Sequence, residues 1–221
     1  MACLNLPLDV RYKPENLYLA AIIPGPTQPS LGNLNHYIRP LVQDLAVSWE
    51  RGVWYSKTAN FPHGRLTRST VALAICDPPA ARHLSALASV GSHFICSACN
   101  CYHKMNYGRV DYKSWIPRDK EKLRKYAELW QDATTSGKCN RLFKEHGVHW
   151  SELWCLPYWD PACQLVVDSM HCFLEGLVQH HVRTLLGLTN KKASPGTAST
   201  SGKKESGCSS LQHIIVPHVA L

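Results

Sequence analysis

The chain of 221 residues carries 24 Lys and Arg against 16 Asp and Glu, a formal net charge of +8, and 45% of its residues are hydrophobic. This length and composition are sufficient for one sizeable buried core. The charge permits a polyanionic partner, but Lys and Arg are spread along the chain and do not identify one by themselves.

The positions of the apolar residues argue against a membrane-spanning protein and against a secreted protein. No apolar run approaches the roughly 18 to 20 residues that a membrane-spanning helix needs. The first residues, Met1 to Pro7, lack the basic and apolar regions of a secretory signal. We therefore expect a soluble intracellular protein, neither secreted nor bound to a membrane, whose ten cysteines are thiols, some of them metal ligands.

Apolar runs and turns in the first third of the chain indicate alternating strands and helices. Residues 17–23 form a short apolar run that the Pro-Gly-Pro turn at 24–26 closes, so we expect a strand there. Residues 31–49 have apolar side chains at helical spacing, which predicts a helix. Residues 53–56 predict a second strand. Together with the strand described next, this order favours a mixed α/β sheet.

The uncharged apolar run at residues 69–76 predicts a strand buried on both faces. Asp77 follows it, and two prolines and a helical pattern over residues 79–89 come next. Asp before Pro is a common helix start, so Asp77 is predicted to cap this helix. A carboxylate at a strand end is also where open α/β sheets place their chemistry. The residues alone leave both readings open.

Cys96 and Cys99 are separated by two residues, a spacing that lets both thiolates reach one tetrahedral metal ion from a tight turn. Zinc is the default choice inside cells. Cys101 and His103 are near enough to complete the site, and His171 is a more distant candidate. Two unliganded thiols are the alternative. A thioredoxin-like redox role is weaker, because the pair follows a loop and does not open a helix.

Residues 104–165 read as a helical insertion, with helices at 120–130 and 139–146. The aromatic residues at 150–161 could stack on bases if they were exposed. Since Trp and Tyr usually bury large areas, we expect them instead to wedge the insertion against the main sheet. A short apolar run at 165–168, a helix to about residue 187 and a polar tail over residues 190–210 follow.

Several short motifs occur in a fixed order between residues 4 and 188. They are LNLP (4–7), RYKPEN (11–16), IPGP (23–26), CDPPAAR (76–82), CSAC (96–99), LPYWDP (156–161) and DSMH (168–171). This succession resembles the transposase domain of CACTA-type (En/Spm-like) DNA transposons, and most closely the copies abundant in mushroom-forming fungi.

The resemblance implies a ribonuclease-H-like fold whose acidic residues bind two divalent ions, Mg²⁺ or Mn²⁺, for cleavage and transfer of DNA strands. Asp77 matches the second catalytic aspartate of the family. Cys96, Cys99 and His171 match its zinc-type motifs, so the resemblance implies a structural zinc in an insertion. DNA, in particular transposon ends, is the implied partner, and the nucleus is the implied location.

Departures from the family pattern affect the expected activity. The first catalytic carboxylate of the family lies upstream of the segment that matches residue 4, and the third lies beyond the helix that ends near residue 187. We therefore expect a transposase-like protein that is truncated at both ends and has no strand-transfer activity on its own. The alternative is a non-catalytic, zinc-stabilised module that binds nucleic acid.

These readings combine into one predicted organisation, a mixed α/β protein with a partial ribonuclease-H-like core and a mainly helical, zinc-binding insertion. The predicted parts are the core (residues 1–95), the cysteine motif and insertion (96–165), a returning strand and helix (166–189) and a disordered tail (190–221).

Overall fold

The computed structural model of this chain describes residues 1–103, 106, 108–188 and 218–220. The chain divides into two compact units. The first consists of residues 1–167 together with 215–221, and the second of residues 168–214. Most of the predicted tail, residues 190–217, lies outside the described residues.

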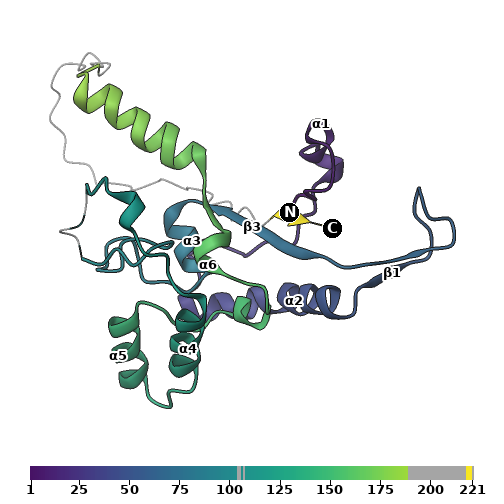
Figure 1. The fold of residues 1–221 in the computed structure, drawn as a ribbon, viewed down its shortest axis with the longest axis horizontal. Coiled ribbons are helices and arrows are strands. Elements are labelled where there is room, and N and C mark those ends of the chain that lie inside the picture. The colour runs from purple at the N-terminus through teal and green to yellow at the C-terminus, as the bar shows by residue number, and fades with distance from the viewer. Residues whose placement is uncertain (104–105, 107, 189–217, 221) are drawn as a thin grey trace, which may run out of the picture. The chain divides into compact units, whose positions relative to one another are not determined.

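The first unit contains two small sheets, which confirms a mixed α/β protein (Figure 1). In the larger sheet, β3 (Thr70–Cys76) is the central strand. It pairs in parallel with β4 (Leu165–Val167) and antiparallel with β5 (His218–Ala220). The other sheet is a hairpin of β1 (Val53–Tyr55) and β2 (Arg65–Thr67).

Strand β3 is buried, as its uncharged apolar sequence predicts. Val71, Ala74 and Cys76 are buried and the other residues of the strand are half-buried. β5 lies within the predicted disordered tail, and it pairs along one side of β3. Unpaired backbone N–H and C=O groups at a sheet edge bind any strand that can reach them, so a short segment can pair there without a strong sequence signal.

Polar side chains cap most of the longer helices of the first unit. Ser30, Asp77, Asp119 and Thr135 each accept a hydrogen bond from a backbone N–H in the first turn of the helix that follows. The helical segments, shown with the strands in Figure 1, are α1 (Leu8–Arg11), η1 (Pro14–Asn16), α2 (Leu31–Glu50), α3 (Pro78–Leu84), η3 (Tyr112–Ser114), α4 (Lys120–Gln131), α5 (Ser136–His146), η4 (Glu152–Cys155) and α6 (Pro161–Gln164).

The prediction of a strand at residues 17–23 is wrong. Only Leu17 forms a β-bridge, to Ala2, and the residues after it have no regular structure. Tyr18, Leu19 and Ile22 are exposed. An apolar run of strand length becomes a strand only where a partner strand and a covering layer exist, and this run has neither among the described residues.

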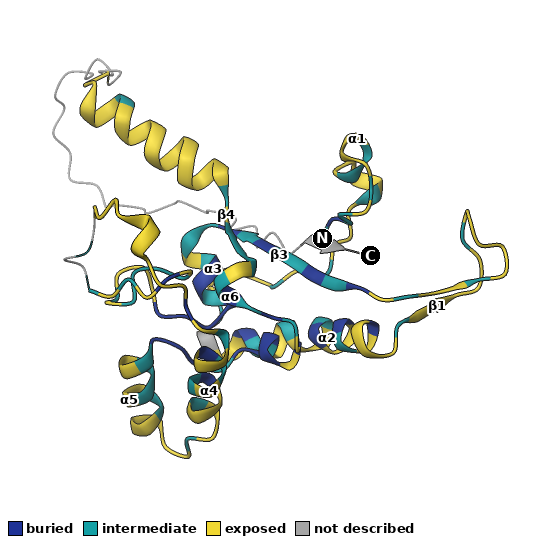
Figure 2. Ribbon diagram, viewed as in Figure 1, coloured by how far each residue is buried: buried dark blue, intermediate teal, exposed yellow. Residues whose placement is uncertain are grey.

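The hydrophobic core crosses the predicted boundary at residue 95. Side chains of α2, β3, α3 and α4 pack together with residues 148–159, so the core and the predicted insertion share one interior (Figure 2). Trp154 and Trp159 are each 1% exposed. The prediction that the aromatic segment wedges the insertion against the sheet is therefore confirmed.

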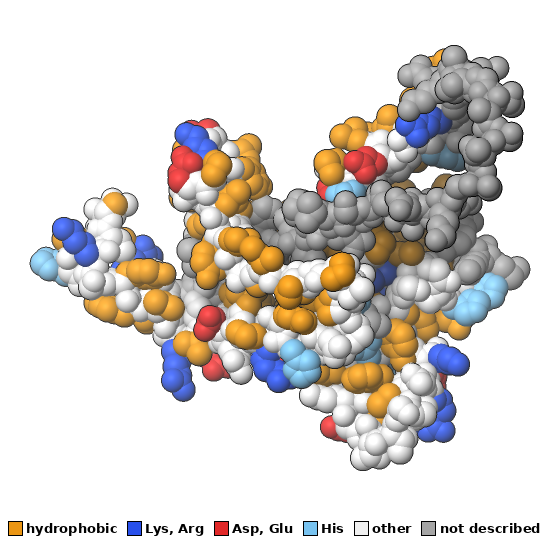
Figure 3. All heavy atoms as spheres, turned by 180° about the vertical axis from the view of Figure 1, so that it is seen from behind, with side chains coloured by type: hydrophobic (Ala, Val, Ile, Leu, Met, Phe, Trp, Pro, Cys, Tyr) orange, Lys and Arg blue, Asp and Glu red, His pale blue; other side chains and the backbone are white. Residues whose placement is uncertain are grey.

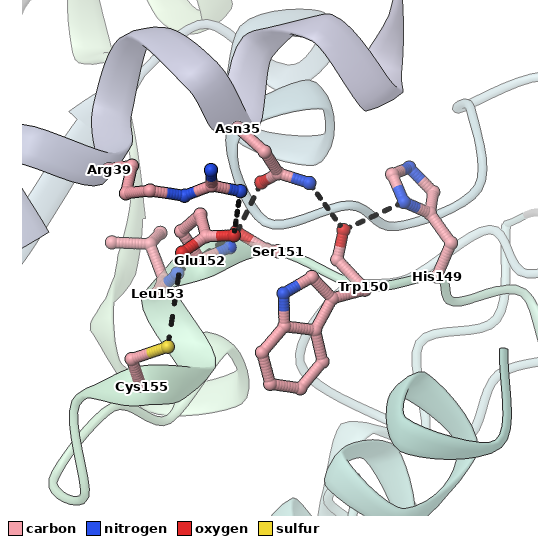
Figure 4. A network of polar contacts seen from close by, with 8 residues as sticks. All are labelled: Asn35, Arg39, His149, Trp150, Ser151, Glu152, Leu153 and Cys155. Atoms are coloured by element: carbon pink, nitrogen blue, oxygen red, sulfur yellow. Dashed lines mark hydrogen bonds and ion pairs between the residues drawn. The ribbon is translucent and has the colours of Figure 1, made fainter. Parts of the chain in front are cut away.

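Polar contacts fix this segment on α2 (Figure 4). The Asn35 side-chain amide donates to the Trp150 carbonyl (3.1 Å) and accepts from the Glu152 N–H (2.9 Å). One turn further along α2, Arg39 forms an ion pair with Glu152 at 3.0 Å. Because Asn35 bonds to backbone groups on both sides of Ser151, it sets the register between α2 and η4.

The described part of the second unit is helical. Residues 170–178 (η5) and 181–185 (η6) are π-helical, where the sequence predicts an ordinary α-helix. The apolar side chains of the predicted stripe, Met170, Phe173, Leu174, Leu177 and Leu185 among them, are exposed. No helix in the described residues is long and apolar enough to cross a membrane.

His149 is a buried titratable group beside this core. It is 3% exposed, lies against the rings of Trp130 and Phe143, and its Nδ1–H donates to the Trp150 carbonyl at 2.9 Å. Its Nε2 has no hydrogen-bond partner in the described part of the chain. Burial, with a smaller contribution from the charge of His83, lowers the pKa of His149 from 6.5 to about 4.

We expect this histidine to make folding sensitive to acid. The unfolded chain binds a proton near pH 6.5 and the folded chain only near pH 4. The stability that His149 contributes is therefore complete above pH 6.5 and is lost as the pH falls towards 4, by up to about 3 kcal/mol. Urea unfolding of the wild type and of His149→Asn, which keeps a side-chain N–H, measures this loss. Equal pH dependence in both proteins would contradict the assignment.

Candidate functional site

Asp77 lies where the central strand ends and α3 begins. Its Oδ1 accepts a hydrogen bond from the Ala80 N–H at 2.7 Å, and Pro78 occupies the first helical position. The prediction that Asp77 caps the helix is confirmed. Its Oδ2 has no hydrogen-bond partner among the described residues, so one carboxylate oxygen is available to a ligand.

The sheet gives Asp77 the position expected of a functional carboxylate. β3 and β4 run in parallel with Cys76 opposite Val167, so both strands end at the same edge of the sheet. Asp77 directly follows Cys76 at that edge. Ligands of open α/β sheets bind outside the carboxyl ends of the strands. Its catalytic role, which the resemblance implies, stays a prediction.

His171 belongs to the second unit, whose first residue, Asp168, follows β4 in the chain. Within that unit, His171 Nδ1 hydrogen-bonds to Asp168 Oδ2 at 2.5 Å, and the Met170 N–H donates to Asp168 Oδ1 at 2.8 Å. This is a capping arrangement at the start of η5. The role of His171 as a zinc ligand stays a prediction.

Cys96 and Cys99 lie together in a loop, as their spacing predicts. The Cys99 N–H donates to Cys96 Sγ at 3.3 Å. A β-bridge between Cys99 and Pro117 joins this loop to the segment before α4. The Asn100 N–H donates to the Ile116 carbonyl at 2.8 Å and reinforces the connection. The cysteine pair does not open a helix, which agrees with the argument against a thioredoxin-like role.

A buried guanidinium holds the chain that leads into this loop. Arg82 of α3 is 5% exposed. It donates to the carbonyls of Ala88 and Phe94, both at 2.7 Å, and to that of Ile95 at 2.6 Å. Because a buried cation is costly unless it is hydrogen-bonded, these bonds stabilise the path from α3 to Cys96.

A second buried guanidinium lies on the other side of the loop. Arg118 is 8% exposed, and its Nε donates to the Cys99 carbonyl at 3.3 Å. Its guanidinium also lies 5.7 Å from the centroid of the Phe94 ring. Burial, and then the nearby charge of Arg82, lowers the pKa of Arg118, whereas the two cysteines act in the opposite direction.

The two thiols differ in acidity. Burial by itself would raise the pKa of Cys96, but hydrogen bonds from Cys99 and from the Cys99 and Ala98 amides, together with the charge of Arg118, lower it. Burial and the hydrogen bond with Cys96 raise the pKa of Cys99. Cys96 is therefore the thiol that ionises first, and a thiolate is the form that binds metal.

Cys96 and Cys99 could supply two of the four ligands of a tetrahedral zinc site. Two sulfur atoms lie close together, and the nearby charge of Arg118 helps to lower the pKa of one of them, Cys96. No group of three His, Cys, Asp or Glu side chains placed to hold a metal is found in the part of the chain that the structure describes. His103, a predicted candidate, stacks on the His93 ring at a centroid distance of 4.8 Å. The choice among Cys101, His103 and His171 stays open.

Sequence reasoning missed the roles of the two arginines. Arg82 falls within the CDPPAAR motif, and its neighbours Ala81 and Leu84 are buried. An Arg within the buried stretch of a short helix is the signal that could have found it. Arg118 follows Pro117 in a polar loop and carries no comparable signal.

Comparisons with known proteins support one family. A family model described as "Transposase family tnp2" matches residues 1–133. The match contains β3, Asp77 and both cysteines, and it ends just after α4. No curated protein and no solved structure matches the chain significantly.

We expect removal of the Arg118 charge to slow the reaction of the Cys96 thiol. Without this cation the pKa of Cys96 rises, so less thiolate is present near neutral pH. In metal-free protein, alkylation by iodoacetamide, followed at Cys96 by peptide mass spectrometry, should be several times slower in Arg118→Met than in the wild type. Arg118→Lys, which keeps the charge, should recover part of the rate.

The matched control is Arg141→Met, which removes an exposed cation from α5. Equal rates at Cys96 in the wild type and in Arg118→Met would show that Arg118 does not lower the pKa of this thiol.

Proposed function

Because the chain belongs to the tnp2 transposase family, we propose that it is a transposase-like protein of the CACTA type whose partner is DNA. The observation that carries the proposal is the family match over residues 1–133, which contains both the strand-end carboxylate and the cysteine loop. The net charge of +8 favours a polyanionic partner. A nuclear location goes with this function.

A ribonuclease-H-like core is the fold that the family resemblance implies for this chemistry. The parallel pair of β3 and β4, with Asp77 at its carboxyl end, supports it. In that chemistry Mg²⁺ or Mn²⁺ activates a water or a DNA 3′-hydroxyl and stabilises the leaving oxygen. Asp77 would hold such an ion through Oδ2, while Oδ1 stays hydrogen-bonded to α3.

Asp77 is the one residue of this chain that matches the three catalytic carboxylates of the family. A single carboxylate neutralises little of the charge of two divalent ions and holds them weakly. We therefore propose that this polypeptide alone binds DNA without transferring strands. A non-catalytic, zinc-stabilised module that binds nucleic acid is the second candidate function, and the cysteine loop supports it.

A structural zinc on Cys96 and Cys99 would stabilise the loop that the Cys99–Pro117 bridge joins to the segment before α4. Two thiolates neutralise one Zn²⁺, and the nearby charge of Arg118 favours the thiolate form of Cys96 that such an ion needs. Such an ion would contribute directly to the stability of the loop.

Elemental analysis of the purified chain tests the zinc site. We expect about one zinc per chain, lost when Cys96 and Cys99 are both replaced by Ser. The matched control replaces Cys155 and Cys163, two exposed cysteines, by Ser and should keep the metal. Folded wild-type protein that contains no zinc would contradict the site, whatever the variants do.

Plasmid nicking tests the role of Asp77. With Mg²⁺ or Mn²⁺ present, we expect supercoiled DNA to be nicked no faster by the wild type than by Asp77→Asn. Asn still accepts the bond from the Ala80 N–H, so this variant keeps the helix cap and loses only the charge. Asp119→Asn makes the same change at the cap of α4. Nicking by the wild type and by Asp119→Asn, but not by Asp77→Asn, would establish a catalytic role and contradict the proposed inactivity.

A further inference from the structure

The β1–β2 hairpin carries positive charge without any negative charge. Residues 51–69 contain Arg51, Lys57, Arg65 and Arg68 but no Asp or Glu. All four side chains are exposed, and within the described residues none of them forms an ion pair. Exposed cations that form no ion pair within the described residues are available to an anionic ligand.

Aromatic rings are exposed on the same hairpin. The side chains of Trp54, Tyr55 and Phe61 are 62%, 45% and 42% exposed, whereas Trp154 and Trp159 in the core are 1% exposed. Figure 2 colours most of the hairpin as exposed residues, and Figure 3 shows basic and apolar side chains on it. These rings remain largely exposed after the hairpin has formed and lie beside the exposed cations, so they are available to a ligand.

The structure holds the Trp54 ring in place. A Cβ added at Gly64 would come within 2.7 Å of Trp54 Cζ2, so the indole packs directly on the backbone at that glycine. Gly64 has φ +89°, a conformation that favours glycine. The ring is therefore supported on one side by the opposite strand and still mostly exposed.

The other face of the hairpin combines a cation with a ring. Tyr55 pairs with Arg65 across the strands, and the Arg65 guanidinium lies 4.5 Å from the centroid of the Phe61 ring. Hydrogen bonds between Thr58 and Phe61 close the loop, at 3.1 and 3.3 Å. The hairpin therefore carries both aromatic rings and cations along its length.

We propose that the β1–β2 hairpin binds single-stranded DNA that passes around the edge of the ribbon, with Lys57, Arg65 and Arg68 on phosphates and with Trp54, on the face opposite Arg65, stacked on an unpaired base. Proteins that bind single strands combine backbone cations with exposed aromatic rings in this way. Phosphate contacts alone would explain the cations but not the rings, because the base faces of a duplex are already stacked. The inference rests on the proposed function in that DNA is taken as the ligand.

Fluorescence anisotropy with a labelled single-stranded oligodeoxynucleotide tests the cations. Replacing Lys57, Arg65 and Arg68 by Gln should weaken binding at least tenfold and reduce the slope of log K against log salt by about 2, because about 0.7 is lost per phosphate contact on a single strand. The control replaces Lys138, Arg141 and Lys144 of α5 by Gln. These residues are also exposed, and their loss should change affinity and slope little.

The ring is tested separately. Trp54→Leu should weaken binding roughly fivefold to hundredfold, whereas Trp54→Phe should retain most of the affinity. Leu keeps an apolar contact over Gly64, and unchanged thermal unfolding would show that the hairpin is intact.

The outcomes separate this inference from the proposed function. If the wild type binds neither single-stranded nor duplex DNA, the proposed function fails. If it binds DNA but the hairpin variants bind equally well, or the α5 control weakens binding as much, only the hairpin assignment is overturned. Tighter binding of the duplex, or of single-stranded RNA with the same sequence, would overturn the assignment to unpaired DNA.

Discussion

The arrangement of the candidate site depends on the hydrogen bonds that the buried Arg82 guanidinium donates. The guanidinium donates hydrogen bonds to the carbonyls of Ala88, Phe94 and Ile95. These three residues lie on the route from α3 to Cys96. Because Asp77 caps the same helix, one short element positions both the strand-end carboxylate and the cysteine loop. A change in α3 would therefore disturb both.

The cysteine loop combines features that are individually costly. Two guanidiniums are buried near each other, which lowers the pKa of Arg118, and a partly buried thiol is made more acidic than usual. The two features favour each other, because the cysteines raise the pKa of Arg118 and the charge of Arg118 lowers the pKa of Cys96. The more acidic thiol is the form of cysteine that the proposed zinc site needs, whether or not Asp77 takes part in catalysis.

Aromatic residues serve two different purposes in this chain. Trp154 and Trp159 are buried and join the segment before β4 to α2 and the sheet. Trp54 is carried by a ribbon that has its own sheet and remains exposed. For the proposed binding of DNA, the exposed rings are the ones available, and exposed cations that form no ion pair within the described residues lie on the same hairpin.

Local signals in the sequence determined much of the fold. The helices at α2, α4 and α5, the buried strand β3 and the cap at Asp77 follow from apolar spacing and from capping residues, which act within a few positions along the chain. The proximity of Cys96 and Cys99 follows from their two-residue spacing, and the family was already indicated by the order of motifs.

The tertiary structure decided what depends on distant partners. Residues 17–23 have the composition of a strand but no strand beside them, and β5 forms because β3 offers an unpaired edge. The contacts of Arg82 and Arg118 and the exposure of Trp54 depend on backbone and side chains that the sequence does not place next to them. Hydrogen bonding and burial are properties of three-dimensional neighbours, so spacing along the chain cannot reveal them.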